Sequence, residues 1–281
     1  MQTKIIELMQ AAQLGGPAAR HPAPALVRAC TVPPSQPAAE PWREALALIA
    51  LHVPLARRPI AAGMPIQHAG DPFARLHLVN RGVCKSVGFG GDGRQQIVAL
   101  HFRGDWVGFD GIAHERCATD ACAMNDSEIW SMNYAALLKV AAGIPALARL
   151  IAAAMSAELA RTRAWRNALC TLAALQRVAD FLCGWHRSQH ERAPPGEAIV
   201  LCMTRAEIGN YLGLTTETVS RAMSQLEQRG LIGITAHERR HIGVPDVAAL
   251  CRFAAATAER GGQRAIRAMR PPLSAPRGLP H

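Results

Sequence analysis

Aromatic side chains and long apolar runs are scarce in this sequence of 281 residues. Aromatic residues make up 5% of the chain, so we expect cores built mainly from Ala, Leu, Val and Ile. The longest apolar candidate, residues 146–159, is interrupted by Arg149 and Glu158. Because a membrane-spanning helix needs about 20 apolar residues, the sequence predicts no membrane span and no membrane partner.

Neither a signal peptide nor a compact cysteine framework is expected from this sequence. The eight cysteines are dispersed along the chain, unlike those of a small scaffold held by disulfides. The N-terminal stretch MQTKIIELMQAAQL carries Glu7 among its apolar residues and has no convincing cleavage site, which argues against a signal peptide. We therefore expect a cytoplasmic protein with free thiols.

Positive charge is in excess but unevenly distributed. The net charge of +10 suits a polyanionic partner such as a nucleic acid. Half of this excess lies in residues 251–281, whereas residues 203–250 carry five basic and five acidic side chains. A nucleic-acid function must therefore be argued from a motif and not from total charge.

Composition divides the chain into five segments. They are an arm rich in Pro and Ala, a strand-rich domain that opens with a helix over 42–53, a long helix, a second and mainly helical unit, and a basic tail. Because strand-rich and helical segments follow one another, we expect an α+β fold. We expect the arm to be flexible, apart from a short helix over 1–12. The segments are 1–41, 42–141, 142–170, 171–250 and 251–281.

The second segment contains short strand-like runs separated by turns. Gly-Gly-Asp-Gly at 90–93 lies between two such runs and predicts a hairpin. Strands at this spacing are typical of a small antiparallel barrel or sandwich. The predicted strands are 76–79, 83–89, 95–102 and 128–132.

Apolar residues recur at steps of three and four along the predicted long helix. Two interpretations stay open: packing of the helix on the strand domain, or a dimer interface where small Ala residues allow close approach. The residues of this apolar stripe are Leu147, Ile151, Ala154, Met155 and Leu159.

A helix-turn-helix pattern begins at Thr204 and reads TRAEIGNYLGLTTETVSRAMSQLEQRGLIGI. Thr204 and Glu207 have the spacing of a capping box, and Gly213 suits a tight turn between two crossing helices. Thr215 or Thr216 would cap the second helix. In such a unit the start of the second helix enters the major groove of DNA.

Three polar residues at the start of the second helix share one predicted face: Glu217, Ser220 and Arg221. Arg can bond guanine O6 and N7, Glu can accept a hydrogen bond from cytosine N4, and Ser suits either role. The alternative is that Glu217 and Arg221 form only an exposed ion pair. The pattern favours base recognition.

A predicted wing follows, with strands over 231–235 and 241–244. Arg239 and Arg240 at its tip are candidate phosphate contacts. Further hydroxyl or backbone contacts to phosphate are expected from Thr204, Thr216 and Thr218.

The stretch MTRAEIGNYLGLTTETVSRAMSQLEQRGLI closely resembles the signature of the CRP/FNR family of bacterial transcription regulators, particularly its FNR/FixK branch. Residues 58–110 resemble the family's sensory β-roll, and the segment around Met155-Ser156-Ala157-Glu158 resembles its dimerisation helix. The resemblance covers about residues 55–250. It implies a β-roll, a long dimerisation helix and a C-terminal winged helix-turn-helix.

The resemblance also implies partners and a DNA sequence. It implies a homodimer that reads inverted TTGAT-type half-sites in double-stranded DNA, with Glu217, Ser220 and Arg221 at the base-reading positions. Loops 88–94 and 188–197 match surfaces that contact RNA polymerase in relatives, which implies activation by recruitment.

The sequence departs from the family where cofactors bind. The iron–sulfur members carry a tight N-terminal cysteine group and one cysteine in the β-roll, whereas this arm has only Cys30 and the β-roll position falls near Trp130. Cyclic-nucleotide binders have a Gly-Glu cassette followed by Arg-Ser. Here residues 104–108 lack that Glu, and Arg116-Cys117 matches only loosely. We expect no cofactor, neither an iron–sulfur cluster nor cAMP.

Three residues, His114, Cys117 and Cys122, invite a metal or thiol-switch hypothesis. Their spacing contains no paired C-x2-C, so we favour core thiols and no metal site. A haem role for His77 and Cys84 is a further alternative, against a default of buried structural residues.

The sequence thus predicts a transcription regulator that activates its targets and is not an enzyme, since it shows no Ser/His/Asp elbow, no Walker loop and no metal dyad. Three alternatives stay open. The first is a redox-, haem- or thiol-sensing regulator of the same fold. The others are an enzyme with an appended DNA-binding domain and a non-specific nucleoid-associated protein, to which the basic tail would contribute.

Overall fold

The computed structural model describes residues 41–190, 198–234 and 241–256, all of which belong to one compact unit. The predicted arm with its short helix and Cys30, the wing-tip residues Arg239 and Arg240, and most of the basic tail lie outside the described residues.

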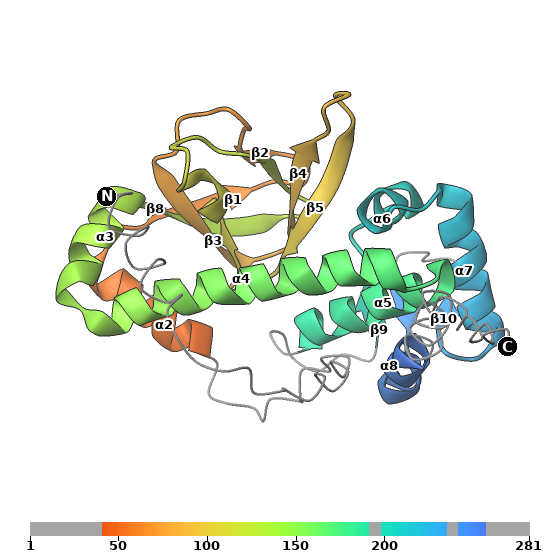
Figure 1. Ribbon diagram of the computed structural model, residues 1–281. Coiled ribbons are helices and arrows are strands. Elements are labelled where there is room, and N and C mark those ends of the chain that lie inside the picture. Colours follow the sequence, from red (N-terminus) through yellow and green to blue (C-terminus); the bar gives the residue numbers. More distant parts are fainter. Residues whose placement is uncertain (1–40, 191–197, 235–240, 257–281) are drawn as a thin grey trace, which may run out of the picture. The chain divides into compact units, whose positions relative to one another are not determined.

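The strand domain consists of two four-stranded antiparallel sheets that follow the first described helix, α2 (Pro41–His52) (Figure 1). One sheet has the order β1-β8-β3-β6 and the other β2-β7-β4-β5. All four predicted strands are present, within one or two residues of their expected ends. The strands are β1 (Ala56–Ile60), β2 (Pro65–Gln67), β3 (Arg75–Arg81), β4 (Cys84–Phe89), β5 (Gln95–His101), β6 (Trp106–Val107), β7 (Asp120–Ala123) and β8 (Ser127–Asn133).

The predicted hairpin joins β4 to β5. The turn is closed by a hydrogen bond of 2.8 Å from the Gly90 amide to the Arg94 carbonyl, and Gly93 adopts a positive φ of 76° that favours glycine. Small and β-branched side chains such as Val79, Ala121 and Ile129 fill the space between the sheets. This matches the expectation of a core with few aromatic residues.

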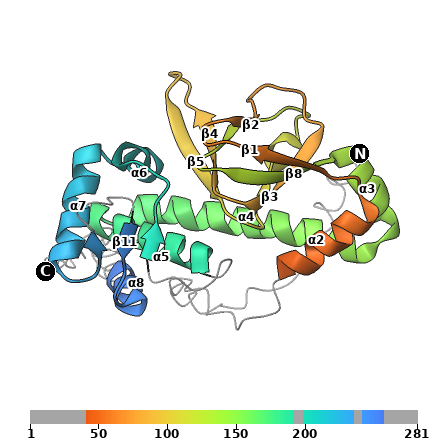
Figure 2. The same ribbon diagram turned by 180° about the vertical axis from the view of Figure 1, so that it is seen from behind.

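Three helices follow: α3 (Tyr134–Gly143), α4 (Pro145–Thr171) and α5 (Ala174–His190). The predicted long helix over 142–170 is α4, which has proline at its first position because that residue needs no amide hydrogen bond there. Figures 1 and 2 both show α4 running past the strand domain to the C-terminal helices.

Leu147 and Ile151 of α4 are buried inside the chain. They belong to the same apolar cluster as Ile49 of α2 and Leu76 of β3, so a single chain already buries their side chains. Of the two interpretations, packing on the strand domain therefore explains these two residues, and their listing as dimer contacts is corrected. The reason is that the first half of α4 packs against α3 and α2, within a cluster that also contains Leu76 of β3.

The C-terminal elements form the expected winged helix-turn-helix. The three short strands pair in the order β10-β11-β9. Helix α8 packs on α5 and buries Leu250 and Ala254, so the folded part of the chain extends beyond residue 250 into the segment that composition had marked as tail. The elements are β9 (Ala198–Val200), α6 (Arg205–Leu212), α7 (Thr216–Gln228), β10 (Gly233–Ile234), β11 (His241–Gly243) and α8 (Val247–Ala255).

Candidate DNA-binding surface

The start of α6 is held by a capping box, as the sequence predicts. The Thr204 hydroxyl accepts a hydrogen bond from the Glu207 amide at 3.1 Å, and the Glu207 carboxylate accepts one from the Thr204 amide at 2.9 Å. The helix ends at Gly213, whose φ of 63° lies in the left-handed region. The first helix of the motif is therefore specified at both ends by local sequence.

The turn between α6 and α7 also depends on Gly209, which the sequence analysis did not single out. A Cβ atom at this position would lie 2.6 Å from the Leu214 carbonyl oxygen, and the Gly209 carbonyl accepts the Leu214 amide at 2.8 Å. Only glycine leaves room for this close approach of helix and turn. The available signal in the sequence was a glycine inside a predicted helix, where glycine is otherwise unfavourable.

Thr215, and not Thr216, caps the second helix. Its hydroxyl accepts the Thr218 amide at 3.1 Å and also bonds the Thr218 hydroxyl at 2.8 Å. Val219 and Met223 are buried on the inner side of α7, against Ile208 of α6. The opposite face of α7 is thereby turned to solvent.

Glu217, Ser220 and Arg221 lie together on this exposed face. The Arg221 guanidinium hydrogen-bonds the Glu217 carboxylate, and the two side chains are 74% and 72% exposed to solvent, respectively. The ion pair that the sequence analysis kept as an alternative is thus present. Such an exposed pair contributes about 0.3–0.5 kcal/mol, which base contacts can replace.

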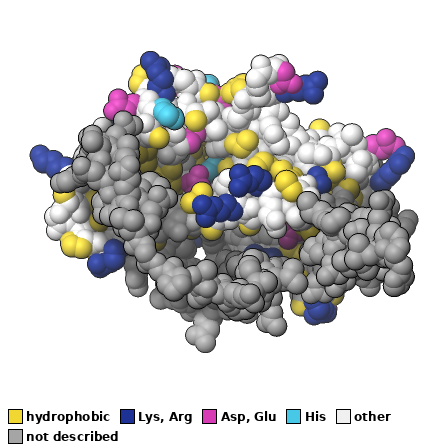
Figure 3. Space-filling model, viewed as in Figure 1, with side chains coloured by type: hydrophobic (Ala, Val, Ile, Leu, Met, Phe, Trp, Pro, Cys, Tyr) yellow, Lys and Arg dark blue, Asp and Glu magenta, His cyan; other side chains and the backbone are white. Residues whose placement is uncertain are grey.

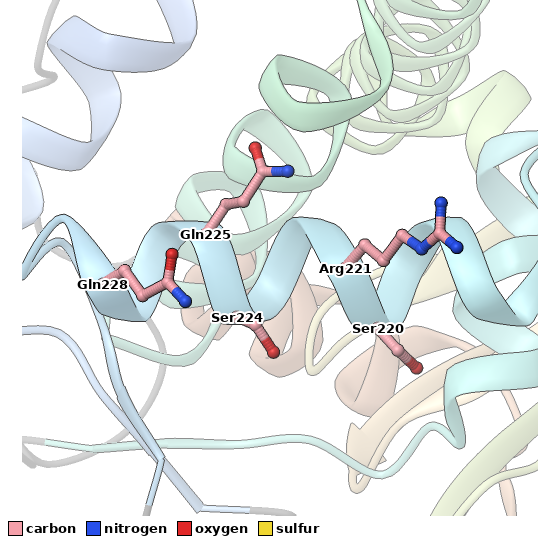
Figure 4. A pocket seen from close by; sticks show the side chains of 5 residues that line it. All are labelled: Ser220, Arg221, Ser224, Gln225 and Gln228. Carbon is pink, nitrogen blue, oxygen red and sulfur yellow. The ribbon is translucent and has the colours of Figure 1, made fainter.

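The exposed face continues along α7 beyond the predicted residues. Ser220, Arg221, Ser224, Gln225 and Gln228 line a shallow hollow beside the helix (Figure 4). In this view Ser220 and Ser224 point to one side, and Arg221 and Gln225 to the other. The last three lining residues were missed, although steps of three and four from Ser220 and Arg221 would have found them.

The remaining candidate phosphate contacts are only partly described. Thr204 and Thr216 are exposed, whereas Thr218 is half-buried and bonded to the cap. Strands β10 and β11 pair antiparallel, with Ile234 opposite Ile242, so the wing has its expected base.

The three metal candidates do not form a common site. His114 is exposed, Cys117 is buried in a loop, and Cys122 is half-buried on β7. Burial raises the pKa of both thiols. Among the described residues, no three His, Cys, Asp or Glu side chains come together as metal ligands would.

His77 and Cys84 are buried strand residues. Burial, followed by the charges of Arg58 and Arg75, lowers the pKa of His77 to about 4, and its Nδ1 lies 2.8 Å from the Ser131 hydroxyl. Burial raises the pKa of Cys84 to about 12. Both environments suit neutral packing groups and oppose a reactive thiolate.

Side chains between β6 and β7, in the segment compared above with a nucleotide-binding cassette, make contacts within the strand domain. The Arg116 guanidinium donates to the Gly70 carbonyl at 2.7 Å, and the Asp110 carboxylate accepts from the Thr119 hydroxyl at 2.7 Å. Phe109 stacks on Trp106 with ring centroids 5.6 Å apart.

On α4, Met155 and Leu159 are 41% and 50% exposed, although both are large and apolar. Ala154 is half-buried and packs at the margin of the cluster around Leu147. Figure 3 shows hydrophobic and basic side chains sharing the surface in the middle of this view. The predicted stripe therefore divides into a buried first half and an exposed second half.

Two family models match the chain. A Crp-like helix-turn-helix domain matches residues 176–253, and a cyclic nucleotide-binding domain matches residues 57–143. In addition, no described helix is long and apolar enough to cross a membrane.

Characterised proteins match over most of their length. Transcriptional regulatory protein btr of Bordetella pertussis is 32% identical over 186 residues, 66% of this chain and 77% of that protein. Transcriptional activator protein anr of Pseudomonas aeruginosa is 30% identical over 197 residues, 70% of this chain and 80% of that protein. The structure of FixK2 from Bradyrhizobium japonicum has a TM-score of 0.63 and 29% identity, covering 71% of this chain and 97% of that one.

Proposed function

Because the chain belongs to the CRP/FNR family of DNA-binding transcription regulators, we propose that it binds inverted TTGAT-type half-sites as a homodimer. The exposed face of α7 carries this proposal. Its Glu217, Ser220 and Arg221 lie side by side at the start of a helix whose opposite side is buried.

Each of these side chains suits one kind of base edge. Arg221 can donate two hydrogen bonds to guanine O6 and N7, and Glu217 can accept one from cytosine N4. A carboxylate facing DNA is repelled by phosphates, so Glu217 on this face favours base recognition over backbone anchoring. Ser224, Gln225 and Gln228 extend the polar surface toward neighbouring bases or phosphates.

The exposed half of α4 supports a homodimer. Met155 and Leu159 lie one helical turn apart, and pairing of two α4 helices would remove both from water. A two-fold dimer places two recognition helices about one turn of DNA apart, which inverted half-sites require. Activation by contact with RNA polymerase is part of the proposal, with the β4–β5 turn and its half-exposed Phe89 as one contact surface.

The family consists of transcription regulators, and we propose no enzymatic activity for this chain. We also propose that its β-roll binds neither cAMP nor an iron–sulfur cluster. The contacts of Arg116, Asp110 and Phe109 support the first statement. The burial of Cys84 and the half-burial of Cys122 support the second.

Footprinting of the full-length protein on a duplex with inverted TTGAT half-sites tests the proposal. We expect sharp protection of both half-sites and none on a duplex of the same composition in scrambled order. Uniform coating of both duplexes would identify a non-specific nucleoid protein. Spectra and metal content of protein purified without oxygen test the sensor alternative, for which a haem or metal signal would be required.

A further inference from the structure

Helix α6 is bound directly by the strand domain. Lys85 of β4 places its Nζ 2.6 Å from Oε1 of Glu207, and the two side chains are only 20% and 28% exposed. Lys85 is one of three lysines in a chain whose positive charge is otherwise carried by arginine. Of the other two, Lys139 is exposed on α3, and Lys4 lies outside the described residues.

A second polar contact joins Asn210 of α6 to the edge of β5. The Asn210 Oδ1 accepts the Ile97 amide at 2.6 Å, and its Nδ2 donates to the Gln95 carbonyl at 2.8 Å. In the described part of the chain β5 pairs only with β4, so these backbone groups face the open edge of the sheet. The Asn210 amide therefore occupies the place of a neighbouring strand.

Apolar packing continues across the same contact. Val83, Ile97 and Phe102 of the strand domain belong to one cluster with Ile208 and the rest of the helix-turn-helix core. The Phe102 ring also meets the Trp185 ring edge-on at 5.0 Å. The polar pairs thus stand at the rim of a packed interface, where an ion pair and an amide fix one relative orientation.

The other end of α6 is held by the helices α4 and α5. Trp165 of α4 stacks on Tyr211 with ring centroids 5.5 Å apart, and Arg177 of α5 donates to the Leu212 carbonyl at 2.8 Å. Because the tight turn at Gly209 joins α6 closely to α7, any rotation of α6 moves the recognition helix. Helix α6 is the place where both the strand domain and α4 can act on DNA recognition.

These contacts leave the recognition face free. Glu217, Ser220 and Arg221 are exposed while Lys85 and Asn210 hold α6. The arrangement is therefore compatible with DNA binding and does not block it.

We propose that the α6 clasp, defined as the Lys85–Glu207 pair and the contact of Asn210 with β5, is the joint through which the β-roll sets the orientation of the DNA-reading helices. The clasp holds the helix-turn-helix unit so that both units of a dimer meet their half-sites together. The inference rests on the proposed function. Preorganisation of this kind raises the affinity for a duplex with two half-sites more than the affinity for a duplex with a single half-site.

The test compares full-length wild type with Lys85→Met combined with Asn210→Ala, and with Lys139→Met as matched control. Glu207 is left in place because it also caps α6. Affinity is measured for a duplex with two half-sites and for one with a single half-site. The duplex carries inverted TTGAT or, where the wild type selects another sequence from a random pool, that sequence.

We expect the double variant to lose about 5-fold or more in affinity for the two-half-site duplex. Its affinity for the single half-site, and both affinities of Lys139→Met, should stay within twofold of wild type. Unchanged affinity for both duplexes, or equal losses on both, would overturn the proposal. Selection of an unrelated sequence by the wild type contradicts the proposed half-site but leaves this comparison intact.

Hydrogen exchange without DNA provides a second readout. In Asn210→Ala, amide exchange should accelerate in the peptide that contains Gln95 and Ile97, because the Ile97 amide loses its acceptor. Exchange in the buried part of α7 should not change. If the β5 peptide exchanges at the wild-type rate, the clasp is not formed in solution and the inference fails.

Discussion

The guanidinium of Arg221 bonds the carboxylate of Glu217 one turn earlier on the exposed face of α7. The pair orients both side chains before DNA arrives. Because each is more than 70% exposed, water already competes for the contact and little is lost when bases replace it. An ion pair and a base-reading surface are therefore compatible descriptions of the same two residues.

Arg221→Ala should weaken binding to the preferred duplex by about 1–3 kcal/mol and relax selectivity at one base pair of each half-site. The reason is loss of a two-bond contact to guanine. Binding to a panel of single-base variants measures both effects, with Arg94→Ala on the β4–β5 turn as control. An unchanged preferred sequence would show that the recognition face is assigned wrongly.

Glu217→Ala should raise the affinity for DNA of random sequence, whereas Arg221→Ala should lower the affinity for the preferred duplex. Removing a carboxylate from the DNA-facing surface reduces repulsion by phosphates, so affinity for random duplex DNA should rise while discrimination at one position falls. Competition binding with specific and random duplexes measures the ratio. A fall in affinity for random DNA would argue that Glu217 serves only to position Arg221.

The exposed and buried halves of α4 should respond differently to substitution. Met155→Glu combined with Leu159→Glu should convert the proposed homodimer to monomer, measured by sedimentation, with little change in the unfolding of the protomer. Leu147→Ala should instead lower the free energy of unfolding by about 2–5 kcal/mol, because it leaves a cavity in a packed core. Sedimentation of Met155→Glu with Leu159→Glu as an intact dimer would remove α4 from the proposed interface.

Gly209→Ala should destabilise the helix-turn-helix by about 1–3 kcal/mol, since its Cβ would press on the Leu214 carbonyl. Gly184→Ala is the matched control, because that glycine lies within α5 with open space around its Cβ position. The control should stabilise the protein by about 0.5–1 kcal/mol through helix propensity. Thermal unfolding of both variants measures the difference, and equal shifts would contradict the tight turn.

Glu158 should make stability depend on pH near neutrality. Burial raises its pKa to about 7; Arg161 opposes this shift, and Asp110 and Asp105 add to it. The folded state therefore retains this proton as pH rises above 4.5, and the stability it contributes is lost as pH approaches 7.

The measurement is the difference in unfolding free energy between wild type and Glu158→Gln from pH 4.5 to 7.5. Taking the difference removes the opposite effect of His77 and His101, whose pKa values burial lowers to about 4. The difference should grow in favour of the Glu158→Gln variant with rising pH, because the amide has no proton to lose. A constant difference, equal to that of the exposed Glu115→Gln, would show that Glu158 is not titrating in this range.

Sequence alone determined the elements whose causes are local. The cap of Thr204 with Glu207, the left-handed Gly213 and the hairpin turn at 90–93 depend on residues only a few positions apart, so pattern and spacing sufficed. The exposed position of Glu217, Ser220 and Arg221 followed from helical periodicity for the same reason. Residues 239 and 240 of the wing tip stay predictions, because they lie outside the described part of the chain.

Tertiary structure decided which segment packs against each helix face and each sheet edge. Along α4, the sequence shows one apolar stripe, but only the packing of α2 and α3 against it buries Leu147 and Ile151 and leaves Met155 and Leu159 exposed. The Asn210 amide contacts the edge of β5, which lies more than a hundred residues earlier in the sequence, and no local pattern encodes this contact. The physical reason is that a periodic pattern specifies which side of a helix is apolar, whereas the partner of that side depends on how distant segments pack.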